Sequence, residues 1–172
     1  MIGATCRAYR FVIASSCPNS RKHTLMTEYD STEEELFHQR HPHLIQCADT
    51  FYHYTFYDAD GSPFQAKPDF YHPELQCWIE FKCHQLNNKK TKQLADESHQ
   101  KQINYKGRDC IKYQLDHAWN HSIFKQAKVQ SSLKAMGKRM IVVFKDGTKL
   151  TTNSINKMKQ QGLEWIFESD LA

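Results

Sequence analysis

Two carboxylates and an amine lie close together in the stretch KPDFYHPELQCWIEFKCHQLN, residues 67–87. Asp69 precedes a short apolar run. Glu80 and Lys82 lie in the next such run, with one residue between them. Carboxylate oxygens are the ligands that hard divalent cations such as Mg2+ prefer. A bound cation of this kind activates a water molecule and stabilises the charge that develops on a phosphoryl oxygen. The three side chains therefore favour hydrolysis of a phosphodiester bond, with the Lys82 amine positioning or activating the attacking water.

The same stretch predicts a β-hairpin that would bring these side chains together. Residues 65–71 and 76–84 have the composition of strands, and the His-Pro-Glu sequence between them suits a turn. Successive side chains of a strand point to opposite faces, so Glu80 and Lys82 would share one face. We therefore expect Asp69 on the first strand to meet Glu80 on the second. The opposite face of the second strand would be apolar and would consist of Cys77, Ile79, Phe81 and Cys83.

Pro68-Asp69, followed by Ile79-Glu80-Phe81-Lys82, resembles the motif of the PD-(D/E)xK nuclease superfamily. The resemblance is carried by this stretch and extends more loosely from Glu33 to Phe144. It implies an α/β (α+β) fold of the restriction-endonuclease type, in which helices flank a central mixed sheet of four strands. It also implies a Mg2+-dependent catalytic site at Asp69, Glu80 and Lys82. The two carboxylates would bind the metal, and Mn2+ would be able to replace Mg2+.

Two predicted helices supply further candidates for this site. In PD-(D/E)xK nucleases the helix after the lysine strand packs beside the site, and here that helix offers Lys125 and Gln126 to support catalysis or bind phosphate. A helix before the sheet sometimes adds a glutamate to the metal site, and Glu33, Glu34 and Glu35 are the candidates. These three would also oppose the dipole of their helix in its first turn, and this is the role that we expect for them.

Positive charge is concentrated directly after the candidate site, although the net charge of the whole chain is +4. Residues 82–139 contain 13 Lys or Arg and 4 Asp or Glu, whereas residues 45–81 contain 1 and 6. A basic surface beside an acidic metal site would draw the phosphates of DNA towards the metal. The lysines that we expect to contact DNA are Lys89, Lys90, Lys92, Lys125 and Lys128.

The function that these residues predict is that of a metal-dependent DNA endonuclease. One site cuts one strand, so the chain fits a nicking, restriction or homing-type enzyme or a junction resolvase. A double-strand cut would require a homodimer or two successive nicks. Alternatives are a non-catalytic nucleic-acid-binding module with the same fold and a nuclease that acts on RNA. A His-Asn-His nuclease site at His117, Asn120 and His121 is less well supported, because one predicted helix carries all three residues.

The composition is that of a globular protein with one domain. With 172 residues, of which 40% are hydrophobic and 24% charged, the chain is long enough for a core without disulfide or metal staples. We expect one nuclease domain at 26–172 and an N-terminal extension without clear periodicity at 1–25. No apolar run is long enough to span a bilayer, and the six cysteines form no CxxC pair. We therefore expect a cytoplasmic protein with reduced thiols, compatible by analogy with a phage, mobile-element or host-defence origin.

Periodicity and turn residues predict the remaining elements. The aromatic run 50–57 predicts a strand that pairs with residues 64–71 through a turn at Asp60-Gly61, so that three strands form a meander. A surface helix at 91–102 would follow the hairpin. The other predicted elements are helices at 32–39, 114–136 and 154–161 and strands at 139–144 and 163–167, with a brief pairing at 148–152.

Overall fold

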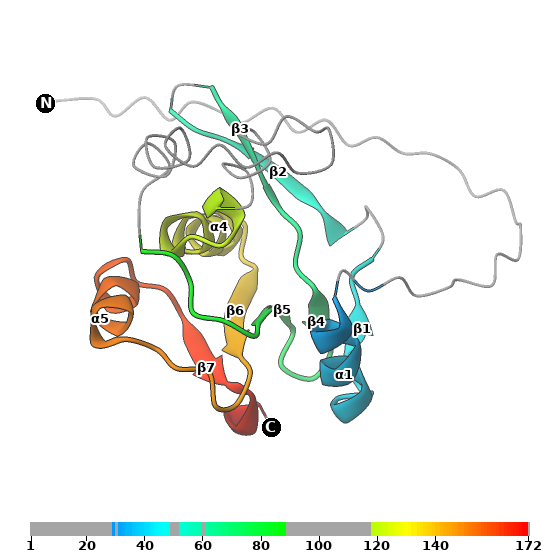
Figure 1. Cartoon of the computed structure of the whole chain (residues 1–172). Coiled ribbons are helices and arrows are strands. Elements are labelled where there is room, and N and C mark those ends of the chain that lie inside the picture. Colours follow the sequence, from blue (N-terminus) through cyan, green and yellow to red (C-terminus); the bar gives the residue numbers. More distant parts are fainter. Residues whose placement is uncertain (1–28, 30, 49–51, 60, 89–117, 172) are drawn as a thin grey trace, which may run out of the picture.

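The structure, a computed structural model, has a mixed five-stranded sheet with helices packed against it (Figure 1). It describes residues 29, 31–48, 52–59, 61–88 and 118–171, so the predicted extension at 1–25 and the predicted helix at 91–102 lie outside the described residues. Its elements are α1 (Thr32–Arg40), β1 (Ile45–Gln46), β2 (Tyr54–Tyr57), β3 (Pro63–Ala66), β4 (Phe70–His72), β5 (Cys77–Lys82), α4 (Ile123–Ala135), β6 (Arg139–Phe144), α5 (Thr152–Gln160), β7 (Trp165–Phe167) and η2 (Glu168–Asp170).

The five-stranded sheet has the order β1-β4-β5-β6-β7. β4 is antiparallel to both of its neighbours, β1 and β5, and β6 runs parallel to both of its neighbours, β5 and β7. α1 covers one face, where Phe37 packs with Ile79, and α4 covers the other, where Val129 packs with Trp78. The predicted α/β class, with helices against a mixed sheet, is therefore confirmed. The sheet has five strands rather than the predicted four.

The predicted meander of three strands is wrong, because residues 64–71 belong to two different strands. β2 and β3 form a separate two-stranded sheet, with Tyr54 opposite Ala66. The chain leaves this hairpin at Pro68, which has no N–H to donate to a ladder, and enters the large sheet at β4. The additional strand of the large sheet, β1, is two residues long, too short to show an alternating pattern in the sequence.

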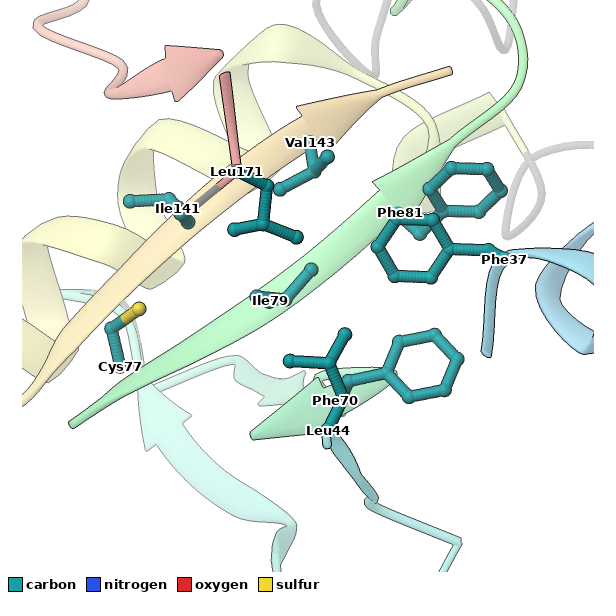
Figure 2. Packing of buried hydrophobic residues seen from close by; sticks show 9 residues of the cluster. All are labelled: Phe37, Leu44, Phe70, Cys77, Ile79, Phe81, Ile141, Val143 and Leu171. Carbon is teal, nitrogen blue, oxygen red and sulfur yellow. The ribbon is translucent and has the colours of Figure 1, made fainter. Parts of the chain in front are cut away.

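The predicted hairpin that carries the candidate site is confirmed by β4 and β5. The two strands are antiparallel, with Phe70 opposite Ile79. Side chains of β5 alternate as predicted, and Figure 2 shows Cys77, Ile79 and Phe81 in a row along the apolar face. Glu80 lies on the opposite face, where it contacts α4. The strand periodicity therefore separates the apolar cluster under α1 from the polar site.

α1 is attached to the rest of the fold at both of its ends. Ser31 caps its first turn by accepting a hydrogen bond from the backbone, and Glu33 pairs with Lys145 directly after β6 at 2.7 Å. At the other end, Arg40 donates two hydrogen bonds to Glu168 of η2, at 2.6 and 3.2 Å. These contacts fix the direction of α1 across the sheet.

The predicted helix at 114–136 is interrupted, and α4 begins only after Ser122. Residues 118–120 form a helical turn, and the positions before them lie outside the described residues. Ser122 then caps α4 by accepting a hydrogen bond from a backbone N–H of its first turn. Asn87 hydrogen-bonds to the backbone on both sides of Ser122 at 2.7 Å, which diverts groups that a continuous helix would use. The end of α4 is as predicted, with Gly137 at a φ of 71°.

The predicted order of strand, helix and strand in the last part of the chain is confirmed by β6, α5 and β7. β6 covers the predicted residues 139–144, and β7 forms a shorter strand than predicted. The predicted pairing at 148–152 is wrong, because Thr151 caps α5 and Thr152 begins it. Thr151 accepts a hydrogen bond from the N–H of Ser154, so its backbone enters a helix.

The described helices include none that is long and apolar enough to cross a membrane. The described cysteines, Cys47, Cys77 and Cys83, are free thiols. Cys77 is fully buried in the core under α1, and Cys83 packs against the same cluster. Both cysteines therefore lie on the predicted apolar face, Cys77 within β5 and Cys83 directly after it.

The attachment of α1 through Phe37 gives a first testable prediction. Phe37 is fully buried and stacks on Phe81, with 4.2 Å between the ring centroids (Figure 2). We expect Phe37→Ala to lower the free energy of unfolding by about 3–5 kcal/mol, because it removes buried apolar surface and leaves a cavity. Leu36→Ala is the matched control, since Leu36 is 40% exposed. Urea unfolding measures both variants, and equal losses would contradict this packing.

Candidate active site

Asp69, Glu80 and Lys82 meet at one place in the fold. The ammonium Nζ of Lys82 lies 2.9 Å from Oε1 of Glu80 and 4.0 Å from Oδ2 of Asp69. The exposed fractions of the three side chains are 16% for Asp69, 10% for Glu80 and 11% for Lys82. The structure thus brings together the three residues that the sequence predicts as catalytic. They form a mostly buried cluster of two carboxylates around one amine.

Backbone hydrogen bonds hold Asp69 in position just before β4. Its Oδ2 accepts a hydrogen bond from the N–H of Phe81 at 2.7 Å. Its own N–H donates to the carbonyl of Ile79 at 3.0 Å, and its carbonyl accepts from the N–H of Cys47 at 2.9 Å. The carboxylate is therefore fixed relative to both neighbouring strands before any ligand binds.

Gln126 of α4 completes the other side of the cluster. Its Nε2 donates to Oε1 of Glu80 and to the carbonyl of Asn120, both at 3.0 Å. Because both partners are acceptors, the amide nitrogen must face them. The side-chain oxygen Oε1 of Gln126 is buried and has no hydrogen-bond partner among the residues that the structure describes. A buried acceptor without a partner is costly, so this oxygen suits a donor such as a water molecule.

Burial makes the protonation of these groups interdependent. Desolvation, followed by the negative charge of Glu80, raises the pKa of Asp69 well above its usual range. Burial also disfavours charge on Glu80, but Lys82, Lys125 and two side-chain hydrogen bonds outweigh it and lower the pKa of Glu80. Burial disfavours the charge of Lys82 as well, but Glu80 and Asp69 outweigh it and raise the pKa of this amine. Lys82 therefore stays protonated at neutral pH.

The three glutamates at the start of α1 have different surroundings. Glu33 is paired with Lys145, and Glu35 is exposed. The charge of Glu34 acts on Asp69 and contributes to its raised pKa. Successive helix residues are rotated by about 100°, so only one of three neighbours can face the site. Glu34 is therefore the glutamate of this group whose charge acts on the site, although it is not grouped with Asp69 and Glu80 to hold a metal ion.

The lysines predicted to contact DNA differ in their positions and contacts. Lys89, Lys90 and Lys92 lie outside the described residues. Lys128 forms an ion pair with Asp58 of the β2–β3 hairpin, and its ammonium lies 4.6 Å from the ring centroid of Phe64. These contacts give Lys128 a structural role in joining the hairpin to α4. Lys125 is 8% exposed and lies beside the site.

Sequence reasoning missed Lys67, which lies two residues before Asp69. Lys67 is exposed, and its positive charge acts on Lys125 across the site. The sequence signal for Lys67 was its position directly before Pro68 of the motif. The larger number of lysines after the motif placed the predicted DNA contacts there instead. In the alternative His-Asn-His set, His117 lies outside the described residues, and the carbonyl of Asn120 binds Gln126.

No protein-family model, no curated protein and no solved structure matches the chain. The interpretation of the site therefore rests on its own geometry and chemistry.

The carboxylate oxygens of Asp69 and Glu80 belong to the ligand type that hard cations such as Mg2+ prefer and softer metals do not. Among the described residues, no three His, Cys, Asp or Glu side chains are grouped to hold a metal ion. Mg2+ needs fewer protein ligands, because it keeps several waters and binds one or two carboxylates. Asp69 and Glu80 would supply these ligands, and the unpaired oxygen of Gln126 would accept a hydrogen bond from a water.

Burial, followed by the charge of Asp69, raises the pKa of the neighbouring Cys47 to about 12, so this thiol stays protonated.

The raised pKa of Asp69 predicts that its charge destabilises the metal-free protein. The folded pKa lies above the value of about 3.9 for an exposed aspartate, so the folded protein binds this proton more tightly. The resulting stabilisation is present below that value and is lost as the pH rises through the folded pKa. In EDTA at pH 8, we expect the melting temperature of Asp69→Asn to exceed that of the wild type by at least about 2 °C. At pH 5 this difference should be smaller.

Thermal melts from pH 5 to pH 8 measure this effect. The exposed Asp170→Asn variant controls for the loss of one negative charge. Addition of Mg2+ at pH 8 should raise the melting temperature of the wild type and not that of Asp69→Asn, because a ligand stabilises the state that binds it. An Asp69→Asn variant that melts below the wild type at pH 8 in EDTA would contradict this account.

Proposed function

We propose that the protein is a metal-dependent DNA endonuclease that hydrolyses phosphodiester bonds. The observation that supports this most directly is the cluster of two buried carboxylates, Asp69 and Glu80, around the ammonium of Lys82. Two buried carboxylates that lie near each other favour the binding of a divalent cation. Perturbed charged groups in a buried cluster are also a feature of functional sites.

Each residue of the cluster has a distinct proposed role. Asp69 and Glu80 would hold the Mg2+, which lowers the pKa of a bound water and offsets charge on the phosphoryl oxygens. Lys82 keeps its proton because both carboxylates raise its pKa. Lys82 would therefore orient the attacking water and stabilise developing negative charge rather than remove a proton. Gln126 would hold Glu80 through its Nε2 and a water through its Oε1.

The arrangement of elements supports a restriction-endonuclease-like fold and membership of the PD-(D/E)xK superfamily. Asp69 lies directly before β4, Glu80 lies on the antiparallel neighbour β5, β6 pairs in parallel with β5, and α4 covers the polar face. Glu34 of α1 adds a third negative charge close to Asp69. A single site of this kind would cut one DNA strand, so the wild type should produce nicked circles before linear molecules.

Plasmid cleavage tests the proposed function. Purified protein should convert supercoiled plasmid to open circles in Mg2+ or Mn2+ and leave it intact in EDTA. We expect Glu80→Gln and Lys82→Met each to reduce the rate by at least about 100-fold, because each removes a charged group that acts on the reacting atoms. Glu74→Gln is the matched control, since Glu74 is exposed in the turn of the same hairpin. Cleavage in EDTA, or full activity of both site variants, would refute the proposal.

A further inference from the structure

Lys125 is a buried cation without a partner in the described part of the chain. Its exposed fraction is 8%, and it lies in the first turn of α4, next to Gln126. Among the described residues, no carboxylate lies within 4.0 Å of its ammonium, and the ammonium forms no hydrogen bond with them. Its backbone N–H donates a hydrogen bond to Oγ of Ser122, which caps α4. The Lys125 side chain itself therefore takes part neither in this cap nor in an ion pair with a described residue.

An unpaired buried ammonium destabilises the fold unless a ligand compensates for it. Desolvation lowers the pKa of Lys125, and the attraction of Glu80 offsets this only in part. Lys82 adds a repulsive positive charge. Lys125 is thus a second amine beside two carboxylates that already interact with Lys82.

The surroundings of Lys125 favour an anion. The first turn of α4 contains no acidic residue, so the positive end of the helix dipole is not neutralised there. Gln126, the next residue, carries the buried oxygen without a partner. Lys67 provides a second positive charge from the exposed side of the site, two residues before Asp69. Lys125 on α4 and Lys67 between β3 and β4 thus bring two positive charges to this part of the fold.

We propose that Lys125 and Lys67 form a subsite that binds a phosphate group of a DNA strand beside Asp69 and Glu80. Lys125 would contact the phosphate from the buried side and Lys67 from the exposed side. The subsite rests on the proposed function for its reaction, but phosphate binding there does not require cleavage. Lys128 is not part of it, because Asp58 and Phe64 already hold its ammonium.

Binding without cleavage tests the subsite. The probe is a fluorescein-labelled DNA duplex in EDTA, with affinity measured by anisotropy over a series of salt concentrations. Each phosphate contact contributes roughly 0.9 to the slope of log affinity against log salt concentration. One phosphate held by both amines accounts for about 0.9 in total, so we expect Lys125→Met and Lys67→Gln each to lower the affinity and to reduce the slope by part of that amount. Lys125→Arg keeps the charge and should retain the wild-type slope.

Lys134→Gln is the matched control for these variants. Lys134 is exposed on the same helix, about 13 Å farther along its axis than Lys125, and its removal should leave the slope unchanged. We also expect Lys125→Met to raise the melting temperature, because it removes an unpaired buried charge. If Lys125→Met does not fold, the exposed Lys67→Gln decides the test. A wild-type slope in Lys125→Met or in Lys67→Gln overturns the subsite.

The same preparations separate the subsite from the proposed function. Wild-type protein that binds DNA through Lys125 and cleaves nothing in Mg2+ would refute the nuclease and leave the subsite intact. Wild-type protein that cleaves, while Lys125→Met binds with the wild-type slope, would refute the subsite and leave the nuclease intact.

Discussion

One ammonium group holds two buried carboxylates together, and the site depends on this interaction. Lys82 lies 2.9 Å from Glu80 and 4.0 Å from Asp69, in surroundings that disfavour any isolated charge. Lys82 lowers the cost of burying the two carboxylates, but this balance is incomplete, because desolvation and the negative charge of Glu80 still raise the pKa of Asp69. A divalent cation would complete this balance. The same electrostatic imbalance destabilises the metal-free fold and would favour binding of a cation at the site.

The rest of the fold holds this cluster from both faces of the sheet. On one face, Phe37 packs α1 onto the apolar side of β5, which leaves the other side of that strand to the site. On the other face, Ser122 sets the start of α4, so that Gln126 reaches Glu80 and Lys125 lies beside it. β5 supplies Glu80 and Lys82 and α4 supplies Lys125 and Gln126. Asp69 lies directly before β4, and backbone hydrogen bonds with Cys47, Ile79 and Phe81 fix it.

Local patterns in the sequence were sufficient to predict the core of the site and insufficient for its surroundings. Alternation along one strand places Glu80 and Lys82 on the same face, and the hairpin needs only a short turn to add Asp69. The interruption before α4 could not be predicted in this way, because Asn87, far away in the sequence, causes it. The pairing of Lys128 with Asp58 likewise depends on how the β2–β3 hairpin packs. Such long-range contacts leave no periodic signal.

Mn2+ binding tests the central claim most directly, because the electron paramagnetic resonance signal of the free ion reports binding without any substrate. Titration of Mn2+ into the wild type should reveal a site that Mg2+ competes for and that Asp69→Asn and Glu80→Gln each weaken strongly. Such a result would establish that the two carboxylates around Lys82 form a divalent-cation site. Binding of equal strength in the wild type and both variants, or no binding to the wild type, would contradict the account.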